Sequence, residues 1–212
     1  MGRSLFILDF DRTIFDTKRF YTDVATVMQT EHHLDVDLLK RTYDAFFDPE
    51  AGGYNIHAHH EHLLGLTADQ FDETIRHHLG NHDYRFPDAA AWMDEHRETD
   101  DDLVIITMGL PRYQKLKFAH CSGLDGITKV IMPSNKGALL KRHIKGEDTT
   151  HDFSFLDQPY DHTYLIDDSA ETFTALGVEP TITGIRLVRE GQRYSTIPTP
   201  PGIREIKSFG DL

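Results

Sequence analysis

The chain has 212 residues, of which 39% are hydrophobic and 27% charged, a composition typical of a globular protein with a substantial core. Its formal net charge of -13 argues against sequence-independent binding of nucleic acid, which requires clustered Lys and Arg. The single cysteine excludes an internal disulfide, and no segment reaches the roughly 20 apolar residues of a membrane span, so we expect a soluble, cytoplasmic protein.

The N-terminal part of the chain predicts one buried strand followed by a long helical insertion. Residues 5–8 form an apolar run, and the next such run begins about 90 residues later, far beyond what one crossover helix needs. Helical patterns at 20–31, 36–47, 67–79 and 89–97 lie between the two runs, with no convincing alternating strand. We therefore predict a helical cap at 17–99, with a loop at 48–53 that faces the site.

The remainder of the chain predicts a parallel sheet. Apolar runs at 103–107, 129–132, 163–166 and 183–188 indicate buried strands, and they are separated by helical stretches at 112–121, 136–144 and 170–176. Strands that alternate with helices are typical of parallel sheets with right-handed crossovers. The predicted fold class is α/β, a Rossmann-like sheet flanked by helices, with a core unit made of residues 1–16 and 100–212.

Two carboxylates follow the first predicted strand, at the edge of the sheet where ligands of parallel sheets bind. Asp9 and Asp11 are two positions apart, so both side chains face the same side of an extended chain. One carboxylate can attack phosphorus while the other transfers protons. Either residue can instead cap a turn or the next helix, and the pair alone does not separate these two interpretations.

Polar residues also follow the next two strands of the predicted core. Thr107, Met108 and Gly109 offer a hydroxyl and backbone amides to a phosphoryl oxygen, although Thr at a strand end often only bonds the backbone. Lys136 lies in the first turn of a predicted helix, where the helix dipole disfavours a cation unless an anion is close. A solvated surface lysine is the alternative at that position.

An acidic pair, Asp167 and Asp168, ends the strand predicted at 163–166. Carboxylates are hard oxygen ligands that suit Mg2+, which usually keeps several waters and needs only one or two protein carboxylates. A carboxylate from the first strand and one from this pair are therefore enough to hold the ion. Helix capping by Asp168 or Ser169 is the alternative.

In this order along the chain, the four sites resemble the four motifs of the haloacid dehalogenase-like superfamily, and the resemblance covers residues 5–188. It implies that Asp9 is the nucleophile, Asp11 the general acid/base, Thr107 the phosphoryl-binding hydroxyl and Lys136 the lysine of the third motif. It also implies substrate contacts from Met108 and Gly109.

The same resemblance implies a Mg2+ ion held by Asp9, the backbone carbonyl of Asp11 and the acidic pair. We favour Asp168 as the direct ligand from that pair, with Asp167 as the alternative. The residue after the second motif Asp is usually Gly, and here it is Arg12. We expect this guanidinium to pair with an acid, the alternative being a contact with substrate.

The function implied by the resemblance is a phosphatase that hydrolyses a small phosphorylated metabolite through an aspartyl-phosphate on Asp9. Asp11 favours this chemistry over dehalogenation, because dehalogenases of this type need no acid/base at that position. A phosphotransferase or phosphomutase that uses the same intermediate, and a catalytically idle binding or regulatory module, are the alternatives. The sequence does not decide which cap residues point toward the substrate; the candidates are Lys18, Arg19, Arg41, Tyr54 and His57.

Four histidines lie between His57 and His62, some of them at spacings that share a helical face. No cysteine accompanies them, and the segment lies inside the predicted cap. We interpret it as a solvated polar helix rather than a zinc site.

Overall fold

The structure, a computed structural model, describes residues 2–48, 53–147, 153–191 and 196–212. Residues 49–52 of the loop expected at 48–53 lie outside the described residues. Six parallel strands form the main sheet in the order β5-β4-β1-β6-β7-β8. Their bounds are Ser4–Asp9 (β1), Asp102–Met108 (β4), Thr128–Met132 (β5), His162–Asp167 (β6), Thr183–Leu187 (β7) and Arg204–Ile206 (β8).

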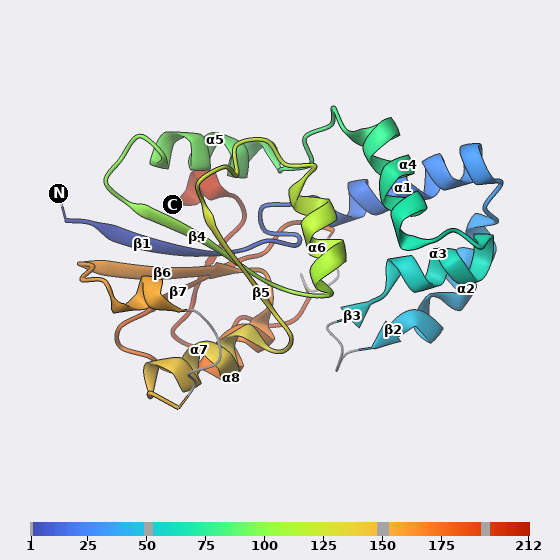
Figure 1. The fold of residues 1–212 in the computed structure, drawn as a ribbon. Coiled ribbons are helices and arrows are strands. Elements are labelled where there is room, and N and C mark those ends of the chain that lie inside the picture. The colour runs from blue at the N-terminus through green and yellow to red at the C-terminus, as the bar shows by residue number, and fades with distance from the viewer. Residues whose placement is uncertain (1, 49–52, 148–152, 192–195) are drawn as a thin grey trace.

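Helices cover both faces of this sheet, as Figure 1 shows. The helix α5 (Pro87–His96) lies on one face, and α7 (Lys136–Ile144) and α8 (Ala170–Leu176) pack together on the other. Alternate residues of β4 enter two separate apolar clusters, Ile105 with the α5 side and Val104 with Ile106 on the α7 side. A strand that is buried on both faces has a continuous apolar sequence, so the parallel α/β prediction is confirmed.

The chain moves outward from β1 through β4 to β5 and then returns to the opposite side of β1 with β6. The strand order therefore reverses beside β1, and ligands of open parallel sheets bind at the carboxyl ends of the strands at such a point. The carboxyl end of β1 is Asp9.

A second, mostly helical unit lies beyond the carboxyl ends of the strands (Figure 1). It follows β1 in the chain, at the position where the insertion was predicted. Its elements are α1 (Thr17–His32), α2 (Val36–Thr42), the 3-10 turn η1 (Tyr43–Phe46), the short strands β2 (Phe47–Asp48) and β3 (Gly53–Tyr54), α3 (Ile56–Leu64) and α4 (Ala68–Leu79).

The ends of these helices follow from local capping. The Asp16 carboxylate accepts from the Arg19 amide at the start of α1, and Thr67 forms a capping box with Gln70 at the start of α4. Gly65 ends α3 in the left-handed region with a φ of 70°, which glycine adopts without strain.

The helix α5 belongs to the sheet unit, although the sequence places it within the predicted cap at 17–99. The Trp92 ring lies 5.0 Å from the Phe6 ring on β1 and 5.1 Å from the Phe209 ring near the C-terminus. We therefore place the junction between the two units just before Pro87. The prediction that the insertion contains no strand is also wrong, since β2 and β3 pair as antiparallel strands. None of the helices in the described ranges is long and apolar enough to cross a membrane.

Gly137 lets α7 approach α8, and replacing it with Ala is expected to destabilise the protein. A β-carbon at this position would lie 1.9 Å from the carbonyl oxygen of Thr172 and 3.0 Å from the amide nitrogen of Leu176. Overpacking of this kind costs about 1–3 kcal/mol, which outweighs the roughly 1 kcal/mol that Ala gains over Gly inside a helix. Urea unfolding should show a lower midpoint for Gly137→Ala. Gly210→Ala is the control, because its β-carbon would meet only Ser208 Oγ at 3.5 Å; equal midpoints for the two variants would contradict the prediction.

Candidate active site

A cavity of about 800 Å³ lies where the sheet unit meets the inserted unit. Its floor is made by residues at the carboxyl ends of the strands and at the start of α7, including Asp9, Thr107, Lys136 and Asp168. Its other wall comes from α1, α2, η1 and the β2–β3 hairpin. The structure thus brings the four predicted motifs together around one cavity, because the carboxyl ends of parallel strands share one edge of the sheet.

Asp9 is buried at the end of β1 and is bound by a lysine from the neighbouring helix. Lys136 Nζ donates to Asp9 Oδ1 and lies 2.7 Å from Asp167 Oδ2, whereas Asp9 Oδ2 has no hydrogen-bond partner among the described residues. Burial raises the pKa of Asp9, the Lys136 ammonium opposes the rise and the Asp167 carboxylate adds to it, which leaves a pKa of about 6. One carboxylate oxygen is thus held by an ammonium while the other is available for chemistry.

Lys136 is an unusual residue for the first turn of a helix, and its surroundings explain its position. Burial alone would lower its pKa, but the carboxylates of Asp167 and Asp9 raise that pKa above its ordinary value, so the side chain stays an ammonium. The helix position predicted a nearby anion, and the protein itself supplies two, the carboxylates of Asp167 and Asp9.

Three carboxylates meet at this point in the structure. Asp9, Asp167 and Asp168 each place an oxygen within 4.8 Å of the other two, and all three side chains are buried. The oxygens of Asp167 are both engaged, Oδ1 by the Ser169 amide at 2.8 Å and Oδ2 by Lys136. Asp168 Oδ2 instead faces the Arg12 guanidinium, with Nε at 3.1 Å.

The cluster has one more acid than base, because among the described residues its three carboxylates pair with two cations, Lys136 and Arg12. Burial raises the pKa of Asp168, the nearby Asp9 raises it further, and Arg12 opposes the rise, which leaves a pKa of about 8. A divalent cation would offset the excess negative charge, and carboxylate oxygens are the donors that Mg2+ prefers. The residues present therefore fit such an ion, with Asp9 and Asp168 as the carboxylates least engaged by other groups.

Arg12 adopts a backbone conformation that favours glycine. Its φ is 66°, in the left-handed region that side chains other than Asn and Asp rarely occupy. Glycine would adopt this conformation without strain, which agrees with the Gly that the resemblance implies at this position. The pairing of Arg12 with an acid is confirmed by its contact with Asp168, and Arg12 also lines the cavity.

Asp11 is held by three donors, none of which the sequence predicted. Lys117 Nζ lies 2.6 Å from each carboxylate oxygen, Thr17 Oγ1 donates to Oδ1 at 2.7 Å, and Gln114 Nε2 donates to Oδ2 at 3.0 Å. Burial would raise the pKa of Asp11, but the Lys117 ammonium and the hydrogen bonds from these donors lower it to about 2. Asp11 is therefore ionised at neutral pH.

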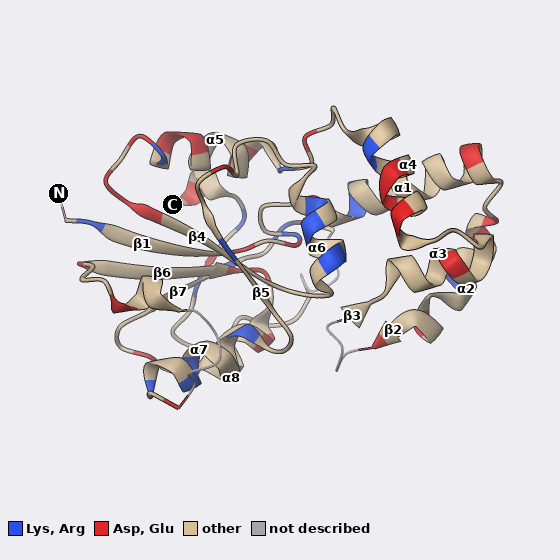
Figure 2. Cartoon of the chain, viewed as in Figure 1, with Lys and Arg blue, Asp and Glu red and all other residues tan. Residues whose placement is uncertain are grey.

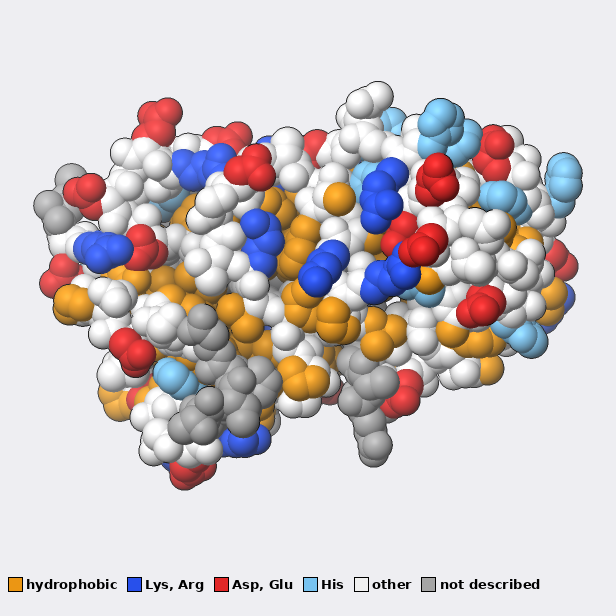
Figure 3. Space-filling model, in the orientation of Figure 1, with side chains coloured by type: hydrophobic (Ala, Val, Ile, Leu, Met, Phe, Trp, Pro, Cys, Tyr) orange, Lys and Arg blue, Asp and Glu red, His pale blue; other side chains and the backbone are white. Residues whose placement is uncertain are grey.

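Lys117 and Gln114 come from α6 (Pro111–Phe118), which follows β4. They are three residues apart and so share one face of the helix. Both are buried, and Lys117 is only 2% exposed. Figure 2 marks basic residues along α6, and Figure 3 shows basic side chains on the surface close to where the two units meet. Basic residues of α6 thus lie beside the site in a protein of net charge -13, and local cations of this kind favour the approach of an anionic substrate.

The end of β4 and the glycine that follows it agree only in part with the phosphoryl-binding arrangement predicted there. The Thr107 side chain is buried, lines the cavity, and its hydroxyl has no hydrogen-bond partner among the described residues. The Gly109 amide, expected to be free for a phosphoryl oxygen, donates to the Met132 carbonyl at 3.3 Å. Gly109 has a φ of 154°, and a β-carbon there would lie 2.3 Å from Gln114 Nε2. Gly109 therefore makes room for the side chain that binds Asp11.

The interpretation of the histidine segment as a solvated polar helix is wrong for three of its four histidines. His57, His59 and His60 are at most 8% exposed and pack inside the inserted unit. Each has a partner: His59 contacts Tyr54 and Thr42, and His60 Nδ1 contacts the Ile56 carbonyl. Among the described residues, the three aspartates at the sheet edge are the one group of side chains placed to share a metal ion.

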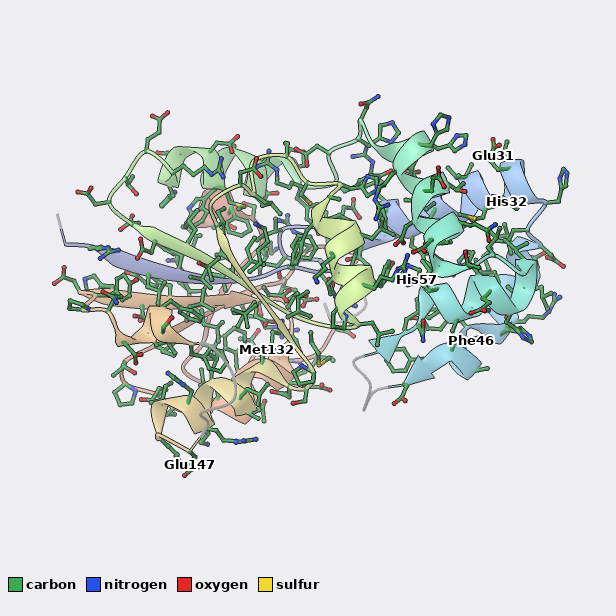
Figure 4. All side chains as sticks on the ribbon, in the orientation of Figure 1. Glu31, His32, Phe46, His57, Met132 and Glu147 are labelled. Atoms are coloured by element: carbon green, nitrogen blue, oxygen red, sulfur yellow. The ribbon has the colours of Figure 1, made fainter. Side chains whose placement is uncertain are left out.

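His57 links the inserted helices to α6, and Figure 4 shows it at that junction. Its Nε2 lies 2.7 Å from Asp72 Oδ1 on α4, and Asp72 Oδ2 accepts from Arg112 Nε on α6 at 2.8 Å. His57 is therefore a structural contact rather than a residue of the cavity wall. Of the cap residues that the sequence left open, Lys18 and Tyr54 line the cavity.

Comparison with solved structures identifies the fold. No family model matches the sequence, and no curated protein matches it. Solved structures do match over the whole chain. A haloacid dehalogenase-like hydrolase from Burkholderia xenovorans LB400 has a TM-score of 0.69 at 17% identity, and the match covers 100% of this chain and 97% of that one.

Two further matches bear on chemistry. The HAD-hydrolase YfnB from Bacillus subtilis, solved with magnesium bound, has a TM-score of 0.60 at 16% identity over 100% of this chain and 97% of that one. A HAD phosphatase from Thermococcus onnurineus has a TM-score of 0.60 at 19% identity over 100% of this chain and 96% of that one. L-2-haloacid dehalogenases are also among the matching structures, so the fold alone does not separate the two chemistries.

Proposed function

We propose that this chain, which has the fold of haloacid dehalogenase-like hydrolases, is a Mg2+-dependent phosphatase that hydrolyses a small phosphorylated metabolite through an aspartyl-phosphate on Asp9. One observation carries the proposal. A buried carboxylate oxygen, Asp9 Oδ2, and a buried hydroxyl, Thr107 Oγ1, line one cavity without a hydrogen-bond partner among the described residues, while Lys136 binds the other oxygen of Asp9. These are a nucleophile, a donor for the transferred group and a cation to offset its charge.

In the first step, Asp9 Oδ2 attacks phosphorus, and the bond from phosphorus to the ester oxygen breaks. Lys136 keeps Asp9 oriented and offsets the negative charge on the phosphoryl oxygens, and the Thr107 hydroxyl donates to one of them. Mg2+, held by Asp9 and Asp168, would supply further charge neutralisation and help to orient the phosphoryl group. The departing oxygen takes its proton from Asp11, which must first have gained that proton from solvent.

In the second step, water attacks the phosphorus of the acyl phosphate, the bond to Asp9 breaks and phosphate leaves. Asp11 is the base that accepts a proton from this water, and its low pKa keeps it in the carboxylate form that a base requires. To act as the acid of the first step, Asp11 must first gain a proton. The network from Lys117, Thr17 and Gln114 therefore favours the base role in the state described by the structure.

A phosphatase is favoured over a dehalogenase by this second carboxylate. Three side chains from two different elements, α1 and α6, converge on Asp11. Burying a carboxylate together with its charged partner costs desolvation free energy. A network of this kind at the edge of a cavity therefore favours a role for Asp11 in the chemistry.

The test is phosphate release from a panel of phosphomonoesters, measured with added Mg2+ and after removal of divalent cations by EDTA. We expect release that falls to background on chelation and returns with Mg2+, together with acid-stable trapping of one phosphoryl group on the peptide that contains Asp9. Halide release from a 2-haloacid is measured in parallel. Halide release without phosphate release would reject the phosphatase in favour of the dehalogenase, and release that persists in EDTA would reject the role of Mg2+.

A further inference from the structure

The wall of the cavity opposite the carboxylates is aromatic. Tyr21 on α1, Tyr43 on η1, Phe47 on β2 and Tyr54 on β3 all line it, so four elements of the inserted unit each contribute one ring. Tyr43 and Tyr54 stack with ring centres 4.4 Å apart, and the Tyr21 ring meets the Tyr54 ring edge to face at 6.1 Å. Contacts between these rings fix the wall before any ligand arrives.

The hydroxyl of Tyr54 is directed to the protein rather than left for a ligand. It lies 2.8 Å from His59 Nδ1, and the other ring nitrogen of His59 contacts Thr42 Oγ1 at 2.7 Å. The buried histidine thus fixes Tyr54 through its polar end. What this residue offers to the cavity is the surface of its ring.

Two apolar side chains in the same cavity are exposed to solvent. Phe47 is 43% exposed and Met108 41% exposed, and they belong to the inserted unit and the sheet unit respectively. Exposed apolar side chains that gather at a concave site typically mark a place where an apolar group binds. A thioether and an aromatic ring are both good contacts for a further ring.

Charged residues of the cavity are concentrated on the carboxylate side, where they are engaged by one another. Arg12 pairs with Asp168, and Lys117 pairs with Asp11. On the inserted side, Lys18, Lys40 and Asp44 also line the cavity, and Lys40 lies 3.8 Å from Asp37. The cavity therefore has a subsite for an anion at the carboxylates and an aromatic region beside it.

We propose that the substrate is a phosphomonoester whose alcohol carries an aromatic ring, which stacks against the wall formed by Tyr21, Tyr43, Tyr54 and Phe47 while the phosphoryl group lies at Asp9. This inference rests on the proposed phosphatase function and names its substrate class. The bonds that form and break are those of the two steps above: the ester oxygen leaves as the aromatic alcohol, and water supplies the oxygen of the released phosphate.

The test compares three esters that share a primary alkoxide leaving group, so that differences in leaving-group reactivity are small. They are 2-phenylethyl phosphate, propyl phosphate and glycerol 3-phosphate. We expect kcat/KM for the phenylethyl ester to exceed both others by about tenfold or more, with most of the difference in KM, since ring contacts add roughly a factor of ten in binding.

Variants of the aromatic wall test whether its rings cause the preference for the phenylethyl ester. Phe47→Ala and Tyr43→Ala should lower kcat/KM for the phenylethyl ester by a larger factor than for the propyl ester, so that the ratio of the two falls. Leu38→Ala is the matched control, since Leu38 is an exposed apolar residue of the inserted unit, 36% exposed, that does not line the cavity. Its kinetics should equal those of the wild type.

Three results would overturn the inference, and they differ in what they leave standing. Equal kcat/KM for the three esters, still dependent on Asp9, would reject the aromatic class and keep the phosphatase. No release from any ester with Mg2+ present would reject the phosphatase and the substrate class together. A phenylethyl preference that survives in both Phe47→Ala and Tyr43→Ala would show that the ring binds elsewhere.

Discussion

Asp9→Asn is expected to lower phosphate release by on the order of 10⁴-fold or more and to abolish the trapped phosphoryl-enzyme. The amide is close to the carboxylate in size but is not a nucleophile, so the substitution removes the attacking atom and little else. Lys136 keeps an anionic partner in the variant, because it also contacts Asp167 at 2.7 Å. Steady-state phosphate release and mass analysis of the acid-quenched protein measure the two expected losses.

The same variant should keep its fold, which makes the loss of activity interpretable. Burial raises the pKa of Asp9 to about 6 from an ordinary value of 3.8, so the ionised side chain is a net cost to the native state above that range. A neutral amide avoids this cost, and we expect the thermal midpoint of Asp9→Asn at pH 7 to equal or exceed that of the wild type. Turnover retained by a folded Asp9→Asn protein would rule out Asp9 as the nucleophile.

Much of the fold could be predicted from the sequence because the sheet is buried on both faces. Continuous apolar runs predicted β1, β4, β5, β6 and β7 to within one residue at each end. The bounds of α7 and α8 are those predicted. The strand β8 was missed because Arg204–Ile206 is short, lies at the sheet edge and contains only one buried residue.

The errors lie where a local pattern does not say which surface a segment contacts. The helix α5 has an apolar face that would suit either unit, and only the contacts of Trp92 with Phe6 and Phe209 assign it to the sheet. The helix α3 contains four histidines, which are polar in any hydropathy scale, but three of them are buried here because tyrosine, threonine, aspartate and backbone groups accept or donate to them.

The motif residues of the site could be predicted because each one ends a strand or begins the next helix. Asp9, Thr107 and Asp168 converge for the topological reason that parallel strands share a carboxyl edge. Lys117 could not be found in this way, since a lysine on an amphipathic helix is nearly always exposed. Its burial depends on Asp11, more than 100 positions earlier in the chain, and no local signal connects the two.

Lys117→Met is expected to raise the pH below which turnover falls on the acidic side of the profile, although Lys117 has no place in the predicted motifs. Without the ammonium, burial of Asp11 is no longer offset, and the pKa of this carboxyl rises from about 2 to above its ordinary value of 3.8. As the pH falls, the step that needs ionised Asp11 then begins to fail at a less acidic pH than in the wild type. The acidic limb of the pH–rate profile should therefore move to higher pH. Lys115→Met is the matched control, because Lys115 is exposed on the same helix and loses the same charge.

The pH dependence of stability should also reflect the pKa of Asp11. In the wild type, the folded-state pKa of Asp11 is lower than the ordinary value, so ionised Asp11 stabilises the native state above about pH 4, and this contribution is lost as the pH falls toward 2. Lys117→Met lacks that contribution, so urea midpoints of the two proteins should differ more at pH 7 than at pH 3. A variant whose acidic limb coincides with that of Lys115→Met would show that Lys117 does not control Asp11. A shifted limb would instead identify Lys117 as the residue that keeps Asp11 ready to accept a proton from water.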